Sequence, residues 1–215
     1  MTWIKVPRHP LMQHALWEGY AMTVEICIVQ GHPDPAEGHL SHALADAYAD
    51  AAETAGHTCH RVAPASLEFG LLRSQAEFES GSPPPDIAQA QNSIEKAGHL
   101  LLIYPLWLGT MPARLKGFLE QVLRPGFAFD YTEGGVPRKR LKGRSARIIV
   151  TMGMPAPAYR WFYGAHSLRS LERNIMTFCG IGPVRHTLIG GAGTITEARF
   201  ATLDRRVRRL GRNAR

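Results

Sequence analysis

The feature that most constrains the fold is an unbroken apolar stretch near the middle of the chain, His99-Leu-Leu-Leu-Ile-Tyr104. Strands that show no alternation of polar and apolar residues are buried on both faces, and they occur mainly in parallel sheets covered by helices. Downstream of Pro112, apolar residues recur at spacings of three and four until Pro125-Gly126, which predicts an amphipathic helix. We therefore expect a central strand followed by a helix.

The rest of the chain repeats this alternation. Strands are predicted at residues 23–30, 59–63, 146–151 and 184–189, and helices at about 40–55, 168–179 and 196–210. Residues 64–90 contain Gly81-Ser-Pro-Pro-Pro85 and are predicted to form an irregular excursion at the edge of the sheet. Five strands alternating with helices predict an α/β fold with an open, mostly parallel, doubly wound sheet. Residues 22–215 are predicted to form one domain, with residues 1–21 as an extension outside it.

Composition limits the class of protein. With 215 residues, of which 45% are hydrophobic, the chain can bury roughly 70% of the surface that it would expose when unfolded. The longest apolar run spans residues 100–108, far short of the ~20 residues that a bilayer span needs. Three cysteines without CxxC spacing favour reduced thiols. We therefore expect a cytoplasmic protein without an integral membrane segment.

The net charge of +7 first suggests a nucleic acid or another anionic partner. The excess is local, because residues 138–147 hold six Lys or Arg and no acid, and residues 199–215 hold seven Arg and one Asp. The second group is interpreted as the solvent face of the last helix, with peripheral membrane contact as the alternative. The first is expected to attract an anionic dinucleotide. No nucleic-acid partner is expected.

Ligands of such a sheet bind beyond the carboxyl ends of its strands, where strand order reverses. Three loops leave predicted strands at this edge: residues 31–41, 104–113 and 151–166. The first matches neither GxGxxG nor GxxxxGK[ST], so it is either an anion site at a helix N-terminus or an ordinary polar loop with an N-cap. In the third, a functional role of His166 competes with a structural one. His57, Cys59 and His60 do not complete a metal site, and we expect none.

The three loops resemble those of one family. Gly31-His-Pro-Asp-Pro35, the segment 104–117 with Gly126-Phe-Ala-Phe129, and Thr151-Met-Gly-Met-Pro155 are similar to the NAD(P)H quinone oxidoreductases with a flavodoxin-like fold. The resemblance runs in order from residue 23 to residue 193. It implies an α/β, flavodoxin-like fold with a five-stranded parallel sheet, doubly wound with helices on both faces.

The resemblance also implies site residues. The phosphate of a bound flavin would contact the first loop at His32, His39, Leu40 and Ser41. The flavin ring would lie against Pro105, Leu106, Trp107, Leu108 and Gly109, and near Thr151, Gly153 and Met154. Tyr159 and His166 would be the catalytic pair, with Tyr163 or Arg160 as substitutes for Tyr159. Phe129 and Tyr131 would bind substrate over the partner subunit's flavin, which implies a homodimer.

The implied function is a two-electron NAD(P)H:quinone oxidoreductase with a ping-pong mechanism. NADPH or NADH would reduce FAD, with FMN as the alternative, and a quinone or similar aromatic acceptor would then take the hydride. Two other hypotheses share the fold: a flavodoxin-type electron carrier, and a regulatory flavoprotein subunit of a cation-efflux transporter. A long-lived semiquinone would favour the carrier, whereas co-purification with a channel and negligible quinone turnover would favour the regulatory subunit.

Overall fold

The computed structural model describes residues 23–215, so the predicted extension over residues 1–21 lies outside the described residues. Within that part of the chain, five strands form one parallel sheet in the order β2-β1-β3-β6-β7. These strands are β1 (Glu25–Gln30), β2 (Thr58–Val62), β3 (His99–Pro105), β6 (Ser145–Thr151) and β7 (Val184–Ile189). β3 is central, as predicted, and six of its seven residues are buried. Strand order reverses between β1 and β3, which is where such a sheet binds its ligands.

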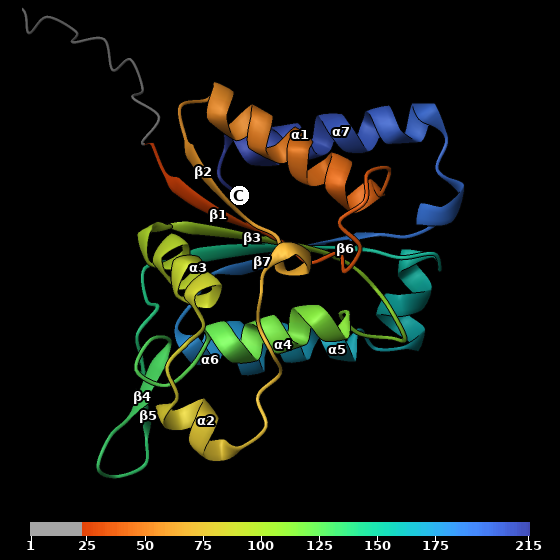
Figure 1. Cartoon of the computed structure of the whole chain (residues 1–215). Coiled ribbons are helices and arrows are strands. Elements are labelled where there is room, and N and C mark those ends of the chain that lie inside the picture. The colour runs from red at the N-terminus through yellow and green to blue at the C-terminus, as the bar shows by residue number, and fades with distance from the viewer. Residues whose placement is uncertain (1–22) are drawn as a thin grey trace, which may run out of the picture.

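Helices cover both faces of the sheet, as Figure 1 shows. One face carries α1 (Leu40–Thr54) and α7 (Glu197–Arg212), which pack against each other. The opposite face carries α3 (Pro85–Lys96), α4 (Ala113–Val122) and one helical stretch made of α5 (His166–Ser170), the π-helix η3 (Leu171–Met176) and α6 (Thr177–Cys179). Leu101 and Ile103 of β3 point into the first core, whereas Leu100 and Leu102 point into the second. The doubly wound, flavodoxin-like α/β fold is confirmed.

Within residues 23–215, no helix combines the length and the apolar character that crossing a bilayer requires. No group of three or more His, Cys, Asp or Glu side chains in these residues is arranged to hold a metal ion.

The prediction for residues 64–90 is wrong over its last part. Pro85–Lys96 form α3, an amphipathic helix that buries Ile87, Ala90 and Ile94. Proline at the first helical position gives up no hydrogen bond and fixes φ near its helical value. The proline run at 83–85 is therefore the start signal of a helix rather than a sign of irregular structure.

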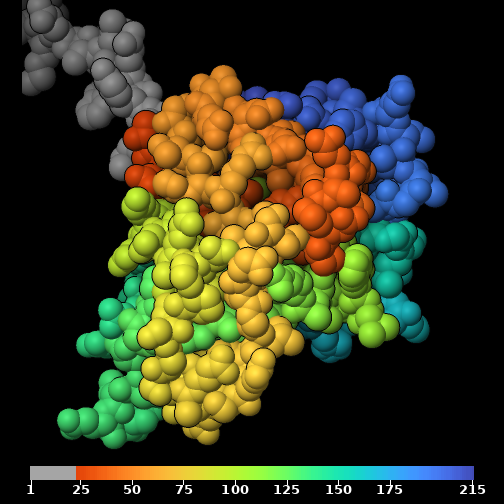
Figure 2. Space-filling model, viewed as in Figure 1, coloured from red at the N-terminus to blue at the C-terminus, as the bar shows by residue number. Residues whose placement is uncertain are grey.

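The irregular part of this segment, residues 64–84, crosses the outer side of α4 instead of following the sheet edge. It contains η1 (Pro64–Ser66) and α2 (Gln75–Ser80), and Figure 2 shows it in yellow at the molecular surface. The carbonyl groups of residues 64–84 accept hydrogen bonds from side chains on and just after α4. Arg114 donates to Pro64, Leu67 and Phe69, Gln121 to Gly70, and Arg124 to Glu77 and Gly81. These bonds satisfy backbone groups that have no sheet partner.

A hairpin that sequence reasoning missed, β4 (Phe129–Tyr131) with β5 (Pro137–Lys139), precedes β6. It therefore lies by the amino ends of the strands, away from the carboxyl-end loops (Figure 1). Arg138 and Arg140 both pair with Asp130 at 2.9 Å, and Arg144 donates to carbonyls at the end of α3. The expectation that the basic cluster 138–147 attracts an anionic dinucleotide stays a prediction. Arg138, Arg140 and Arg144 lie by the amino ends of the strands and have partners there, away from the carboxyl-end loops.

Candidate functional site

The three predicted loops meet at the carboxyl edge of the sheet. The Leu106 N–H donates to the Thr151 carbonyl at 2.7 Å, which joins the loops after β3 and β6. The rings of His32 and Trp107 lie edge to face with centroids 6.0 Å apart, which joins the loops after β1 and β3. A fourth loop, after β7, is held to the third because the Ala192 N–H donates to the Met152 carbonyl at 2.9 Å. Sequence reasoning did not include this fourth loop.

The loop after β1 is organised around Asp34. Its Oδ1 accepts from the Ala36 N–H at 2.9 Å, and its Oδ2 lies 3.0 Å from His39 Nε2. The Ala36 N–H, followed by His39, lowers the pKa of this carboxyl. His32 Nδ1 lies within 3.1 Å of both backbone polar atoms of Asp34, and its ring stacks on that of His39 at 3.8 Å. The loop therefore presents two stacked imidazoles at the start of α1.

Two polar atoms of the first turn of α1 are buried without a hydrogen-bond partner among the described residues: Ser41 Oγ and His42 Nε2. His39 occupies the N-cap, but its side chain makes no capping hydrogen bond. A helix N-terminus carries unsatisfied N–H donors and the positive end of the helix dipole, which together suit an anion. The residues present therefore fit the phosphate end of a nucleotide, and His42 is a member of this set that the sequence interpretation omitted.

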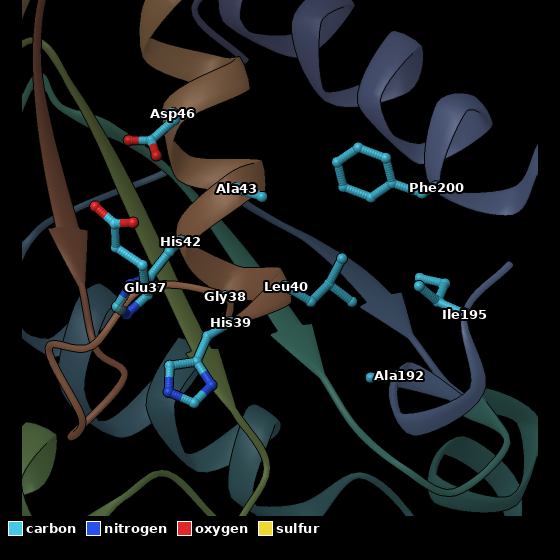
Figure 3. A pocket seen from close by; sticks show the side chains of 10 residues that line it. All are labelled: Glu37, Gly38, His39, Leu40, His42, Ala43, Asp46, Ala192, Ile195 and Phe200. Atoms are coloured by element: carbon cyan, nitrogen blue, oxygen red, sulfur yellow. The ribbon is translucent and has the colours of Figure 1, made fainter. Parts of the chain in front are cut away.

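A cavity of about 480 Å³ adjoins this helix start. Figure 3 shows Leu40 and Ala43 of α1 on one side of it and Ala192, Ile195 and Phe200 on the other, with His39 and His42 directed away from Phe200. Ala192 belongs to η4 (Ala192–Thr194), and Phe200 to the first turn of α7. Phe200 is half-buried and lines this cavity. Gly190-Gly191 directly after a strand was the available signal for a ligand loop here.

The loop after β3 folds into a tight turn that projects Leu108. Trp107 and Thr110 exchange two backbone hydrogen bonds of 2.9 Å, and Leu108 and Gly109 between them have φ of 45° and 78°. Two positive φ values characterise a type I′ turn, which ordinarily takes Asn-Gly or Gly-Gly. Leucine in the left-handed region is strained, and its side chain is fully exposed. The predicted ring-facing segment is therefore rigid and presents an apolar tip.

Beside this turn lies an apolar cavity of about 530 Å³. It is lined on one side by Trp107, Leu108, Thr110, Met111, Pro112, Ala113 and Lys116, and on the other by Ser167, Ser170, Leu171 and Ile175. The helical side of the cavity was absent from the predicted set, because its serines follow no recognisable motif. A mostly apolar cavity with a few hydroxyls suits a flat aromatic ligand.

The remaining predicted residues, in the loop after β6, differ in their exposure. Thr151 is buried, and Gly153 is exposed with open space where a side chain would be. Met154 packs partly against the core, and a Cβ at Gly190 would meet its carbonyl oxygen at 2.6 Å. The close approach of β7 to this loop therefore requires glycine at position 190.

Tyr159 does not fit the catalytic role that the resemblance implied. It lies in η2 (Ala158–Phe162) and is 2% exposed. Its hydroxyl lies 2.7 Å from Ser167 Oγ and accepts from the Leu168 N–H, so it holds the start of α5 rather than facing a ligand. The substitutes Arg160 and Tyr163 are exposed, as is His166 at the first position of α5.

Phe129 and Tyr131 differ in burial. Phe129 is buried in the core of its own chain, edge to face with Phe178 at 4.8 Å, so the expectation that it reaches substrate is corrected. Tyr131 is 58% exposed on the hairpin and is free to meet a partner.

Comparison with known proteins agrees with this geometry. The family model described as flavodoxin-like fold matches residues 24–212. The chain belongs to this family. An uncharacterized NAD(P)H oxidoreductase of Haemophilus influenzae is 34% identical over 143 residues, which cover 64% of this chain and 70% of that protein.

Two further matches carry quinone in their names. NAD(P)H dehydrogenase [quinone] 1 of Rattus norvegicus is 28% identical over 65% of this chain and 52% of that protein, so the match spans about half of the longer relative. The structure of the NAD(P)H:quinone oxidoreductase from Methanothermobacter marburgensis aligns with a TM-score of 0.74 at 26% identity, covering 90% of this chain and all of that one.

Proposed function

We propose that this chain is a flavin-dependent NAD(P)H:quinone oxidoreductase. The observation that carries the proposal is that two features lie together where strand order reverses. One is the start of α1, where Ser41 and His42 leave polar atoms available to an anion, and the other is the apolar cavity beside Trp107 and Leu108. A flavin nucleotide needs both features, because one end is a phosphate and the other a flat ring. The names of the relatives agree with this chemistry.

We propose FAD rather than FMN as the cofactor. Leu40, Ser41 and His32 would hold the phosphate, and the Pro105–Gly109 segment with Thr151 and Gly153 would face the ring. The cavity of about 480 Å³ that continues from the phosphate site toward Phe200 supports a second nucleotide half, which FMN lacks. FMN is the competing cofactor, because a relative from Vibrio vulnificus, 30% identical, is named as FMN-dependent.

When bound, the flavin would supply hydride transfer from NAD(P)H to a quinone. The cavity lined by Trp107, Leu108 and Met111 would hold the flavin ring with the flat acceptor against it, and would keep water from the reacting face. His166, exposed beside the Ser167 that lines the cavity, would donate a hydrogen bond to the edge of the ring that gains negative charge. We expect His166→Ala to slow flavin reduction by ~10- to 1000-fold without loss of flavin, measured by stopped flow. An unchanged reduction rate would contradict this role.

We also propose a homodimer in which Tyr131 reaches the partner's site. The apolar cavity beside Leu108 continues along α4 into a second one of about 270 Å³, and the two share Lys116 and Ile175. Tyr131 borders the far end of this groove. Two-fold pairing along the groove would bring the tyrosine of each subunit toward the cavity of the other. Sedimentation should give a dimer mass, and a monomer at micromolar concentration would contradict the arrangement.

Steady-state turnover tests the proposed reaction. NADPH or NADH and a water-soluble quinone should be consumed with parallel double-reciprocal lines, because both substrates would use the same cavity in turn. Intersecting lines would contradict the shared cavity. A long-lived semiquinone in anaerobic titration, with no turnover, would favour the electron carrier instead.

A further inference from the structure

The loop that would receive the flavin phosphate has an unusual charge balance. Residues 31–46 contain no lysine or arginine but three acids, Asp34, Glu37 and Asp46. Of these, only Asp46 pairs with a permanent cation, Arg61 of β2. Phosphate sites ordinarily supply positive charge from arginine or lysine. The start of α1 supplies backbone N–H donors but no full positive charge, and Arg61 is engaged by Asp46, so protonated imidazoles would strengthen the binding of a phosphate here.

Three imidazoles gather at the right place. The ring of His42 lies edge to face with those of His32 and His39, with both pairs of centroids 5.3 Å apart. His32 and His39 stack on each other at 3.8 Å. Figure 3 shows His39 and His42 on the same side of the first turn of α1. In the part of the chain that the structure describes, His42 Nε2 and the Oγ of the preceding Ser41 are both buried without a hydrogen-bond partner.

We propose that the neighbouring rings of His42 and His32 take up a proton when the phosphate end of the flavin binds, so that cofactor affinity depends on pH. This inference rests on the proposed function, since it requires the flavin site at α1. It adds His42 to the binding residues and assigns His32 and His42 a shared charge.

The groups around His32 and His42 determine whether flavin affinity rises or falls with pH. Burial is the main cause that lowers the pKa of both His32 and His42, so without an anion these rings are neutral near pH 7. Asp34 and Asp46 oppose that shift at His42, and His39 reinforces it. The side chains from η4 and α7 that line the cavity carry no charge. A phosphate stabilises the protonated rings and raises their pKa values, so affinity is highest in acid and falls as pH rises.

The test is a titration of the flavin-stripped full chain with FAD between pH 6 and 8.5. FAD is used because its diphosphate does not ionise in this range, whereas a phosphate monoester such as FMN titrates near pH 6. The dissociation constant should rise up to about tenfold per pH unit for each proton linked. Calorimetry in two buffers of different ionisation enthalpy should show proton uptake at pH 7. Riboflavin, which has no phosphate, should show none.

Two variants make the outcome specific. His42→Gln keeps a hydrogen-bonding side chain but no charge, so it should bind FAD about tenfold more weakly at pH 6.5 and like the unaltered chain at pH 8.5. His60→Gln, in β2 beside Glu25, should change neither value. Equal weakening of His42→Gln at every pH, or FAD binding without proton uptake, would overturn the inference while leaving the proposed function intact. Failure to bind any flavin at any pH would overturn both.

Discussion

The two edges of the sheet both carry polar and charged residues, and they use them differently. At the amino edge, Arg147 is buried and donates to Thr187 Oγ1 at 2.9 Å, although its Nε has no partner among the described residues, and Arg138 and Arg140 share Asp130. At the carboxyl edge, Ser41 and His42 present buried atoms without partners next to a cavity. Arg138 and Arg140 of the basic cluster 138–147 are thus paired within the fold, and the candidate site lies at the other edge, in a loop that has three acids and no lysine or arginine. In this chain, the unpartnered polar atoms beside a cavity indicate the candidate binding site better than the cluster of basic residues does.

The largest expected effect tests how tightly the carboxyl edge is built. A Cβ at Gly190 would lie 2.3 Å from the Ala156 backbone nitrogen, which cannot move away as a side chain could. Gly190→Ala should lower the free energy of unfolding by about 3 kcal/mol and release the flavin. Gly134→Ala, in the hairpin at the other edge, meets nothing within 4 Å and should be neutral within about 0.5 kcal/mol by thermal unfolding. Equal stability of the two variants would contradict this reading.

At the amino edge, acid should lower the stability of the fold through His99. Burial, followed by Arg147 and Arg185, lowers the pKa of His99 to about 4. The unfolded chain therefore binds a proton that the folded chain refuses, so His99 costs nothing above pH 6.5 and destabilises the fold by roughly 3 kcal/mol as pH falls toward 4. His99→Gln should flatten this part of the curve of unfolding free energy against pH. A curve parallel to that of the unaltered chain would show that His99 is not responsible.

Substitution of one serine at each edge allows a direct comparison of the two edges. Ser41 Oγ has no hydrogen-bond partner within residues 23–215, so Ser41→Ala should leave the free energy of unfolding within about 0.5 kcal/mol and weaken flavin binding about tenfold. Ser145 Oγ lies 2.8 Å from His99 Nδ1, so Ser145→Ala should cost about 1–2 kcal/mol of stability and leave flavin binding unchanged. Chemical denaturation and flavin titration of both variants measure the two effects. Loss of stability in Ser41→Ala with unchanged flavin affinity would reverse the assignment.

The smallest effect concerns the strained turn at the mouth of the site. Leu108→Asn creates the Asn-Gly pair that a type I′ turn prefers, so it should raise stability by up to about 1 kcal/mol. It should also raise KM for a quinone, because the exposed apolar tip is lost. Val136→Asn changes an equally apolar exposed residue of the hairpin, where φ is not positive, and should do neither. A destabilised Leu108→Asn would show that the leucine is not strained.

The fold could be predicted because its signals are local. The apolar run at 99–104 and the periodic residues of α4 each fix an element without knowledge of the others. The misreading of residues 64–90 arose because proline at 84–85 starts a helix in one context and breaks regular structure in another. The arginines that hold residues 64–84 on α4 follow no short-range pattern.

For the candidate site, the sequence indicated which loops come together, but it indicated less well which side chains face the cavities. The loops follow from topology, because carboxyl ends of parallel strands share an edge. Which side chain faces the ligand depends on packing: Tyr159 and Phe129 turn into the core, and Phe200 turns toward a cavity. His42, one turn inside α1, becomes a candidate only when the positions of the other rings are known.

The central claim is that the carboxyl edge holds a flavin nucleotide with an extended phosphate end. The most direct measurement is to purify the chain, denature it and identify the released small molecule by mass. FAD at close to one per chain is the predicted result. Absence of any flavin, with none taken up when FAD and FMN are offered to the folded chain, would contradict the claim.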